Sequence, residues 1–248
     1  MKKAAVILLV LMCTIIASTE LFAGMYIKKQ VGRDQTEEIF LESGKLKMVV
    51  GYAGMGPIQI SIVDTAKKRF ILVQPARKVY MEVSFDEYRK FIEEMQKQMP
   101  AMAGMKPGDI PFAADTEEEK RSYKGSGEKI AGYTTKVLLI ERGGRPIERR
   151  LVSERFIKDM LKEVDFSKLS TLGATAGTLA VISEAENIKA MAEEMPLKEE
   201  NLISRIANTV VKVERKRLPA SVFSPPKGYK RVSLKEFFFP GGNMPFGR

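Results

Sequence analysis

The sequence has no histidine and a single cysteine, Cys13. Cys13 lies within the first 23 residues, which have the pattern of an export signal, so the rest of the chain has neither residue type. Such a chain forms no disulfide, offers no thiolate nucleophile or imidazole base, and builds no zinc site from His and Cys. An enzyme would depend on carboxylates, Lys, Ser, Thr or Tyr alone. We therefore expect a protein that is not an enzyme and needs no cofactor.

Residues 1–23 show the three parts of a secretory signal peptide. Two lysines give a basic start, residues 4–16 form an unbroken apolar run, and a less apolar stretch ends in the small residue Ala23. The apolar run is shorter than the roughly 20 residues that a membrane-spanning helix needs. We therefore expect cleavage after Ala23 and a location in the periplasm, with an uncleaved membrane anchor as the alternative.

The net charge of +10 at pH 7 indicates attraction to an anionic partner. Nucleic acid is the first partner to consider for a basic intracellular protein, but export argues against it, so we expect no nucleic-acid partner. An anionic membrane surface or an acidic envelope polymer fits an exported protein better. The alternative is that the basic residues serve only solubility, because they alternate with apolar residues along the strands.

Residues 25–84 alternate apolar and polar side chains with a period of two, which predicts β-strands. Short turn sequences such as Ser43-Gly44 separate the strands, so neighbouring strands must pair antiparallel. Two apolar strand faces are alternative candidates for lining a ligand site. They are Leu46, Met48, Val50 and Tyr52 in one strand, and Ile58, Ile60 and Ile62 in the next.

A helical period begins after Ser84. Residues 84–87 (SFDE) fit a capping box, in which the Ser hydroxyl and the Glu carboxylate each bond a backbone N–H of the other residue. The apolar stripe that follows predicts a helix, ended by Pro100, whose apolar face could cover a ligand as a lid. The candidate lid residues are Phe91, Ile92, Met95 and Met99.

The rest of the chain predicts further elements of both kinds. They are a long mobile connection (99–123), a strand (127–133), a hairpin (134–142 and 146–152), a helix (156–164), short helical pieces (169–195) and two strands (202–218). The three phenylalanines at 237–239 read as an aromatic cluster on a flexible tail. We expect a single α+β domain over residues 24–240, with a tail at 241–248.

Four methionines, Met95, Met99, Met102 and Met105, are concentrated in a short segment. Thioether sulfurs are soft ligands that suit Cu(I). Methionine is also a pliable apolar residue that fills gaps in a core or adapts to varied apolar ligands. Three interpretations stay open: packing in a lid or core, an adaptable apolar-ligand surface, and a copper site.

Three passages together resemble a family of exported bacterial proteins that is similar in turn to the LolA/LolB-like envelope proteins. The passages are residues 75–82 (PARKVYME), 127–133 (GEKIAGY), and 218–223 (LPASVF) with 226–229 (PKGY). The resemblance implies a large, curved, unclosed antiparallel sheet, a half-barrel, with helices covering its concave face. Carriers with that fold hold lipid or lipoprotein acyl chains between sheet and helices.

The leading hypothesis is therefore a non-enzymatic periplasmic protein that binds a lipid, an acyl chain or another apolar ligand. Either strand face would line the sheet side of the site, and the helix stripe would form the lid. The same residues could instead fill an ordinary core, and the protein would then be a structural or interaction protein.

Overall fold

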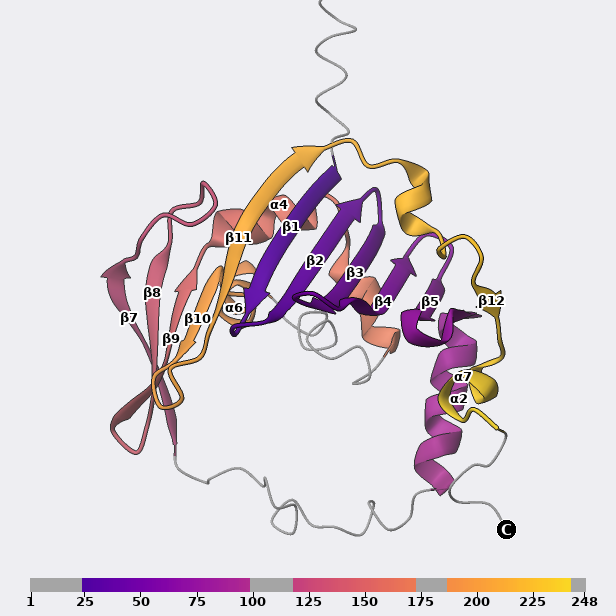
Figure 1. Ribbon diagram of the computed structural model, residues 1–248. Helices are drawn as coiled ribbons and strands as arrows, with labels where there is room; N and C mark the ends of the chain where they lie inside the picture. Colours follow the sequence, from indigo (N-terminus) through magenta and orange to yellow (C-terminus); the bar gives the residue numbers. More distant parts are fainter. Residues whose placement is uncertain (1–23, 99–117, 173–186, 242–248) are drawn as a thin grey trace, which may run out of the picture.

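The computed structural model describes residues 24–98, 118–172 and 187–241 (Figure 1). Within them the chain forms one 12-stranded sheet and a few helices. The strands are β1 (Gly24–Val31), β2 (Gln35–Glu42), β3 (Lys45–Tyr52), β4 (Gly56–Asp64), β5 (Arg69–Gln74), β6 (Val79–Ser84), β7 (Glu119–Ser126), β8 (Lys136–Arg142), β9 (Arg145–Val152), β10 (Lys198–Asn201), β11 (Ala207–Lys216) and β12 (Lys230–Arg231). The α-helices are α2 (Phe85–Gln98), α4 (Glu154–Leu161), α6 (Ile188–Glu194) and α7 (Leu234–Phe238), and the 3-10 helices are η2 (Pro75–Arg77), η3 (Phe166–Leu172) and η5 (Ala220–Phe223).

The sheet is unclosed and almost wholly antiparallel. Its strand order is β12-β6-β5-β4-β3-β2-β1-β11-β10-β9-β8-β7, so β12 and β7 are its edges. The first six strands form a meander, β7 to β9 form a second one, and β11 returns to pair with β1. The two residues of β12 pair parallel with β6. The expected α+β class with one extensive antiparallel sheet is confirmed.

Alternation along the strands gives the sheet two apolar faces. The larger of two hydrophobic clusters contains Leu46, Val63 and Phe70, which lie on one face of the sheet and pack against the helices. The smaller cluster contains Ile60 and Ile62, which lie on the opposite face of the sheet. Residues of the segment after β11 cover them there. Because successive strand residues point to opposite faces, every second residue is excluded from the helix side.

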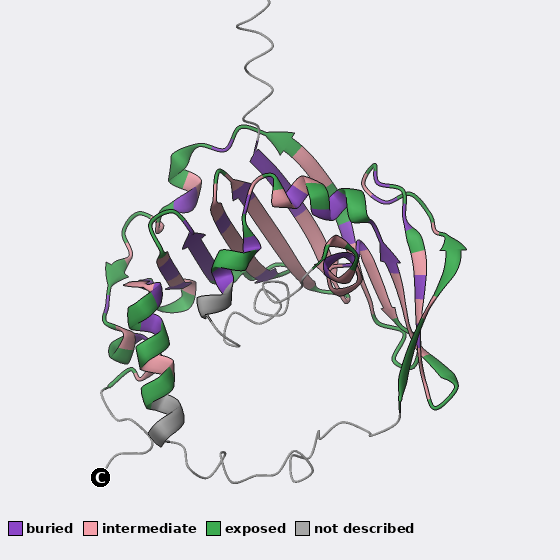
Figure 2. Cartoon of the chain, turned by 180° about the vertical axis from the view of Figure 1, so that it is seen from behind, coloured by how far each residue is buried: buried purple, intermediate pink, exposed green. Residues whose placement is uncertain are grey.

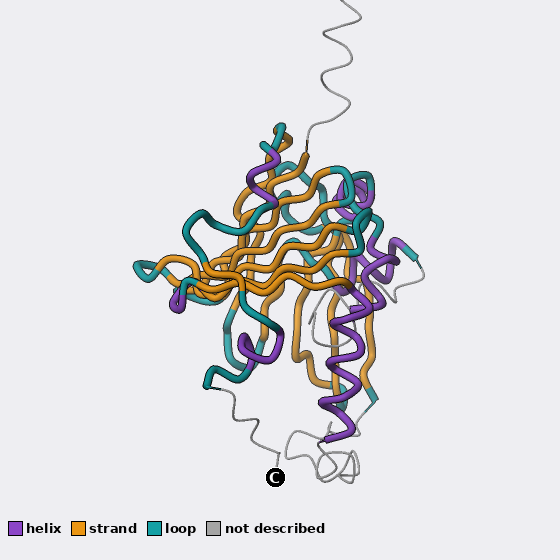
Figure 3. Tube along the Cα trace, turned by 90° about the vertical axis from the view of Figure 1, so that its right-hand side faces the viewer, coloured by secondary structure: helices purple, strands orange, loops and turns teal. Residues whose placement is uncertain are grey.

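Helices α2, α4 and α6 lie on the face toward which the sheet curves. Figure 1 shows α4 and α6 behind the sheet, and Figure 2, seen from the opposite side, shows the helices in front of it. In side view, α2 lies on one side of the strands (Figure 3). Phe156, Ile157 and Met160 of α4 and Met191 of α6 are buried in the larger cluster.

Local signals for several elements agree with the structure. The capping box before α2 is present: the Glu87 backbone N–H donates to Ser84 Oγ at 3.1 Å, and the Ser84 N–H donates to the Glu87 carboxylate at 2.7 Å. The hairpin of β8 and β9 lies within one or two residues of its predicted bounds. Two strands were expected in residues 202–218, but only β11 lies there. β10 ends at Asn201, just before this range.

Two strand predictions are wrong. β7 begins at Glu119, inside the stretch expected to be a connection, and residues 127–133 form a loop with a single bridge between Ile130 and Tyr133. That loop turns at Ala131 and Gly132, which have φ values of 46° and 90°. A left-handed turn favours glycine and cannot continue a strand.

The aromatic cluster at residues 237–239 is also corrected, because it is not part of a flexible tail. Phe237 and Phe238 belong to α7, which begins with Ser233 accepting a hydrogen bond from the Glu236 N–H and packs beside β6. Phe237 is fully buried. The expected signal peptide at 1–23 and the expected tail beyond Gly241 lie outside the described residues.

Candidate functional site

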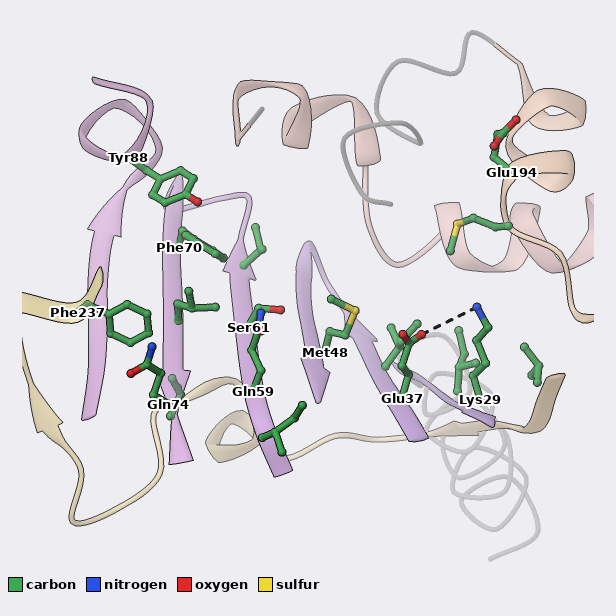
Figure 4. A pocket seen from close by; sticks show the side chains of 18 of the residues that line it. Lys29, Glu37, Met48, Gln59, Ser61, Phe70, Gln74, Tyr88, Glu194 and Phe237 are labelled. Atoms are coloured by element: carbon green, nitrogen blue, oxygen red, sulfur yellow. Dashed lines mark ion pairs between the residues drawn. The ribbon is translucent and has the colours of Figure 1, made fainter. Parts of the chain in front are cut away.

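A cavity of about 860 Å³ lies between the sheet and the helices (Figure 4). Its floor is the helix-facing side of β1 to β5, and its walls come from α2, α4 and α7 and from the segment that joins α6 to β10. Ligand pockets in proteins range from roughly 300 to 1,000 Å³, so the cavity is large enough for a substantial small molecule.

The sheet floor follows from strand alternation and one irregularity. Ile39, Met48 and Ser61 are register neighbours in β2, β3 and β4, and all three face the cavity. The pairing of β3 with β4 slips after Val50, so that Ile58 is an extra residue in β4. In a regular strand, Ile58 would lie on the same face as Ile60 and Ile62, away from the cavity. The bulge turns it toward the cavity instead.

One end of the cavity is aromatic. Phe70 of β5 and Tyr88 of α2 meet edge to face with ring centroids 5.0 Å apart, and Phe237 meets Phe238 in the same way at 5.3 Å. All four rings line the cavity. Phe91 of α2 stacks on Phe238 at 5.4 Å and so supports this end from behind. Figure 4 shows Phe70, Tyr88 and Phe237 close together.

Arg77 attaches α7 to the sheet at this end. Its guanidinium donates hydrogen bonds to the Phe237 carbonyl at 2.9 Å and to the Glu236 carbonyl at 3.3 Å, and it also bonds the side chain of Gln74. A cation at a helix C-terminus is favoured because the last carbonyl groups carry partial negative charge. Arg77 therefore fixes the position of Phe237 and Phe238.

The opposite end of the cavity is charged. Lys29 of β1 and Glu37 of β2 are register neighbours whose Nζ and Oε2 atoms lie 4.0 Å apart, and both side chains are partly exposed. Glu199 of β10 lines the same end and accepts a hydrogen bond from Asn208 at 3.4 Å. Glu194, at the C-terminus of α6, completes this end (Figure 4).

Two arginines hold Glu194 in place. Arg121 Nη1 donates to Glu194 at 3.0 Å, and Arg150 Nη1 lies 3.7 Å from the same carboxylate and donates to the Glu193 carbonyl at 2.7 Å. The hydrogen bond to Glu119, with that to Glu194, raises the pKa of Arg121 above its ordinary value. Arg121 therefore stays protonated across the physiological pH range and available to pair with α6.

The structure brings only some of the predicted ligand residues together at the cavity. Met48 and Ile58 line it, while Leu46 is buried on the same face in the larger cluster. Val50 lies two residues after Met48, on the same face of β3, and Tyr52 is exposed at the end of that strand. The expectation for Ile60 and Ile62 is corrected, because both face the opposite side of the sheet.

The predicted lid helix reaches the cavity through a different residue of its stripe. Tyr88 lines the cavity, whereas Ile92 packs against the larger cluster and Phe91 supports Phe238. Met95 lies in the last turn of α2, and its side chain is outside the described part of the structure. Met99, Met102 and Met105 lie outside the described residues altogether.

Sequence reasoning missed the aromatic wall from α7 and the charged end. The three consecutive phenylalanines were a signal for the first, because such a cluster is rarely left in solvent. The alternation of side chains along β1 and β2 was a signal for the charged end, because Lys29 and Glu37 lie on the same face as Ile27 and Ile39. Nothing in the sequence, however, indicated that β11 and β10 would lie beside β1 and bring in Glu199.

A second surface feature adjoins the cavity. Large apolar side chains are exposed at adjacent turns at one end of the sheet, and we call this group the apolar edge. Its members are Tyr52, Met55, Ile58, Ile203 and Ile206. Hydrogen bonds from the Ala53 N–H to the Asp34 carbonyl and from the Gly32 N–H to the Ala207 carbonyl hold the three turns together. Because Ile58 belongs to both features, the cavity reaches this edge.

Within the described residues, no group of three or more His, Cys, Asp or Glu is placed to hold a metal ion. Across residues 24–98, 118–172 and 187–241, no helix has the length and apolar character needed to span a bilayer.

No model of a protein family matches the chain, and no curated protein matches it. Among solved structures, the fold is similar to the crystal structure of an uncharacterized conserved protein from Thermus thermophilus, with 8% sequence identity and a TM-score of 0.41. The similarity covers 87% of this chain and 93% of that chain. At this TM-score the likeness carries no conclusion about family or function, so a functional argument has to rest on the cavity and its lining.

Proposed function

We propose that this protein is a non-enzymatic binding protein of the periplasm that holds a lipid, an acyl chain or another apolar ligand between its sheet and its helices. The observation that carries the proposal is the cavity of about 860 Å³. An ordinary domain core is packed to the density of organic crystals and has few voids larger than a water molecule. A hollow of this size between the sheet and the helices therefore favours binding over simple packing.

The lining of the cavity suits an apolar chain. Met48, Leu72 and Phe70 offer flexible aliphatic and aromatic surface along the floor. Burying methylene groups contributes about 0.8 kcal/mol each, so a chain of several carbons gains enough free energy to bind without any covalent step. Opening and closing would need only small shifts of the helical walls.

The architecture also supports a carrier of the LolA/LolB-like type. An unclosed antiparallel sheet that curves around helices is what the resemblance of residues 75–82, 127–133 and 218–229 leads us to expect. We extend the resemblance to the fold type and to the class of ligand, and to no individual binding residue.

The test is ligand binding by a cavity-filling variant. Native mass spectrometry after gentle purification should find bound amphiphile, and a fluorescent fatty acid should bind the stripped protein. Met48→Trp should weaken that binding at least about tenfold, because the indole occupies the centre of the cavity.

Lys28→Trp is the matched control, since Lys28 lies on the opposite face of β1 and is 40% exposed. It should bind like the wild type. Consistently ligand-free protein without affinity for fatty acids would instead support a structural or interaction protein.

The apolar edge favours an anionic membrane surface as the partner. Met55 and Ile203 are 80% and 75% exposed, and the exposed Arg33 and Arg205 lie in the same turns, with Asp34 as the acidic neighbour. Apolar side chains beside basic ones suit the boundary between anionic headgroups and acyl chains. The adjoining cavity would then open toward the source of its ligand.

A further inference from the structure

The two ends of the cavity differ in chemistry. Phe70, Tyr88 and Phe237 lie at one end, and Lys29, Glu37 and Glu194 lie at the other (Figure 4). Glu199 also lines the cavity. A purely apolar ligand would satisfy the aromatic end but would remove water from the charged end without replacing its hydrogen bonds. Desolvating ionised groups without a partner is strongly unfavourable. The cavity is therefore suited to a ligand with one apolar and one polar end.

The charged end carries an excess of negative charge. Arg121 and Arg150 neutralise Glu194, but these arginines are also engaged by further carboxylates. Those carboxylates are Glu119, Glu148 and Glu193. Arg150 is the register neighbour of Glu199 in β9 and interacts with its charge, but its guanidinium donates hydrogen bonds to Glu148 and to the Glu193 carbonyl. Among the described residues that line this end of the cavity, Lys29 is the one cation, against the carboxylates of Glu37, Glu194 and Glu199.

The geometry of Lys29 and Glu37 leaves their charges available to a ligand. Their separation of 4.0 Å exceeds the 2.7–3.2 Å of a protein hydrogen bond, so each is held only by electrostatic attraction. The bond between Asn208 and Glu199 is also long, at 3.4 Å. An ammonium group beside Glu37 or Glu199 could form a short, charge-assisted hydrogen bond with the carboxylate. A carboxylate or sulfate in the same position would meet a like charge.

We infer that the cavity binds an amphiphile whose head carries an ammonium group, with the head at the end lined by Lys29, Glu37 and Glu199 and the apolar chain at the aromatic end. This inference rests on the proposed binding function and adds the class and orientation of the ligand. Lys29 can form an ion pair with an anionic group in the same head. Zwitterionic heads with a primary ammonium therefore fit as well as simple amines.

Three probes with the same chain and different heads test the inference: dodecylammonium, laurate and dodecanol. Each displaces a bound fluorescent probe at concentrations below micelle formation. Dodecylammonium should bind at least about tenfold more tightly than laurate, with dodecanol between them, because the local charge is negative.

The chain offers matched controls for the charged residues. Glu38 and Lys28 form an equivalent cross-strand pair 3.9 Å apart, one position along each strand and on the opposite face. Glu37→Gln should reduce the preference for dodecylammonium over laurate at least about fivefold, and Lys29→Gln should increase it. Glu38→Gln and Lys28→Gln should leave the preference unchanged.

The outcomes separate this inference from the function on which it rests. If all three probes bind with similar affinity in every variant, the cavity is an apolar binding site but the ammonium inference is wrong. If laurate binds most tightly, the inference is wrong in sign. If even dodecanol does not bind the wild type, the proposed function itself fails.

Discussion

Tyr133 connects the loop before β8 to helix α4. Its hydroxyl donates to Asp159 Oδ2 at 3.1 Å, and its ring meets Phe156 edge to face with a centroid distance of 5.4 Å. Burial, followed by the neighbouring charge of Asp159, raises the pKa of Tyr133 to about 12. The folded state therefore binds the phenolic proton more tightly than the unfolded chain does.

This shift predicts a specific alkaline loss of stability. The contribution of Tyr133 is fully present below its ordinary pKa of about 10 and is lost as pH rises through about 12. Urea midpoints measured from pH 9 to pH 12 should fall, and Tyr133→Phe should reduce the slope. Tyr52→Phe, at an exposed ring, should leave the slope unchanged. Equal slopes in wild type and Tyr133→Phe would contradict the prediction.

At the level of single residues, the sequence indicated which side chains share a strand face but not which face the helices cover. Met48 and Ile60 both sit on apolar faces of neighbouring strands, yet only Met48 faces the cavity. The apolar segment around Phe223 covers the other face, so β4 and β5 are apolar on both sides. Alternation cannot distinguish inside from outside in such strands. The bulge at Ile58 could not be foreseen either, because it depends on how β3 pairs with β4.

Helix α2 begins directly at the end of β6, and the capping box makes this abrupt change of structure possible. Ser84→Ala removes the side-chain acceptor of the Glu87 N–H and one hydrogen bond to the Glu87 carboxylate. We expect a loss of about 1 kcal/mol in the free energy of unfolding, measured in urea, because N-cap serines typically contribute that amount. Ser84→Thr keeps the hydroxyl and should lose much less. An equal loss in the two variants would indicate that the cap is not responsible.

The position of α7 depends on Arg77. Replacing Arg77 by Ala removes its hydrogen bonds to the Phe237 and Glu236 carbonyls. We expect a loss of about 1–3 kcal/mol in stability and earlier proteolytic cleavage near α7, because hydrogen bonds to charged groups contribute about that much. Arg89→Ala is the control, since Arg89 forms an exposed ion pair with Asp86, and it should change stability by less than about 0.5 kcal/mol. Unchanged proteolysis in Arg77→Ala would show that α7 is held by other contacts.

Whole elements were predictable where a periodic pattern or a turn signal was strong. The hairpin of β8 and β9 and the start of α2 are examples. β7 was missed because it is an exposed edge strand whose residues, EKRSYKGS, are polar on both faces. α7 was missed because five residues are too few to show a helical period, and the proline and glycines that follow suggested a tail.

At the scale of the whole molecule, the pairing of β11 with β1 joins the two meanders into one sheet. That pairing links residues far apart in the sequence, and the local pattern of neither strand specifies its partner. It also assembles the site, because Glu199 comes from β10 while Lys29 and Glu37 come from the first meander. Whether the interior is hollow is likewise a property of the assembled fold, since a filled core and a cavity use the same apolar residues.

The joined sheet also brings the three turns of the apolar edge together, which leads to a prediction about membranes. The protein should co-sediment with vesicles that contain an anionic lipid such as phosphatidylglycerol more than with purely zwitterionic vesicles, and less at high salt. A double variant, Met55→Ser with Ile203→Ser, should bind at least about tenfold more weakly, because each lost apolar side chain removes favourable burial. Arg33→Gln with Arg205→Gln should mainly reduce the dependence on anionic lipid.

Val211→Ser is the matched control, since Val211 is also an exposed apolar side chain but lies in β11, outside the apolar edge. It should bind vesicles like the wild type. Because Met55 and Ile203 do not line the cavity, the double variant should still bind dodecylammonium with wild-type affinity. Loss of vesicle binding with intact ligand binding would show that the apolar edge and the cavity bind independently. An equal loss of vesicle binding in Val211→Ser would show that the edge has no special role at the membrane.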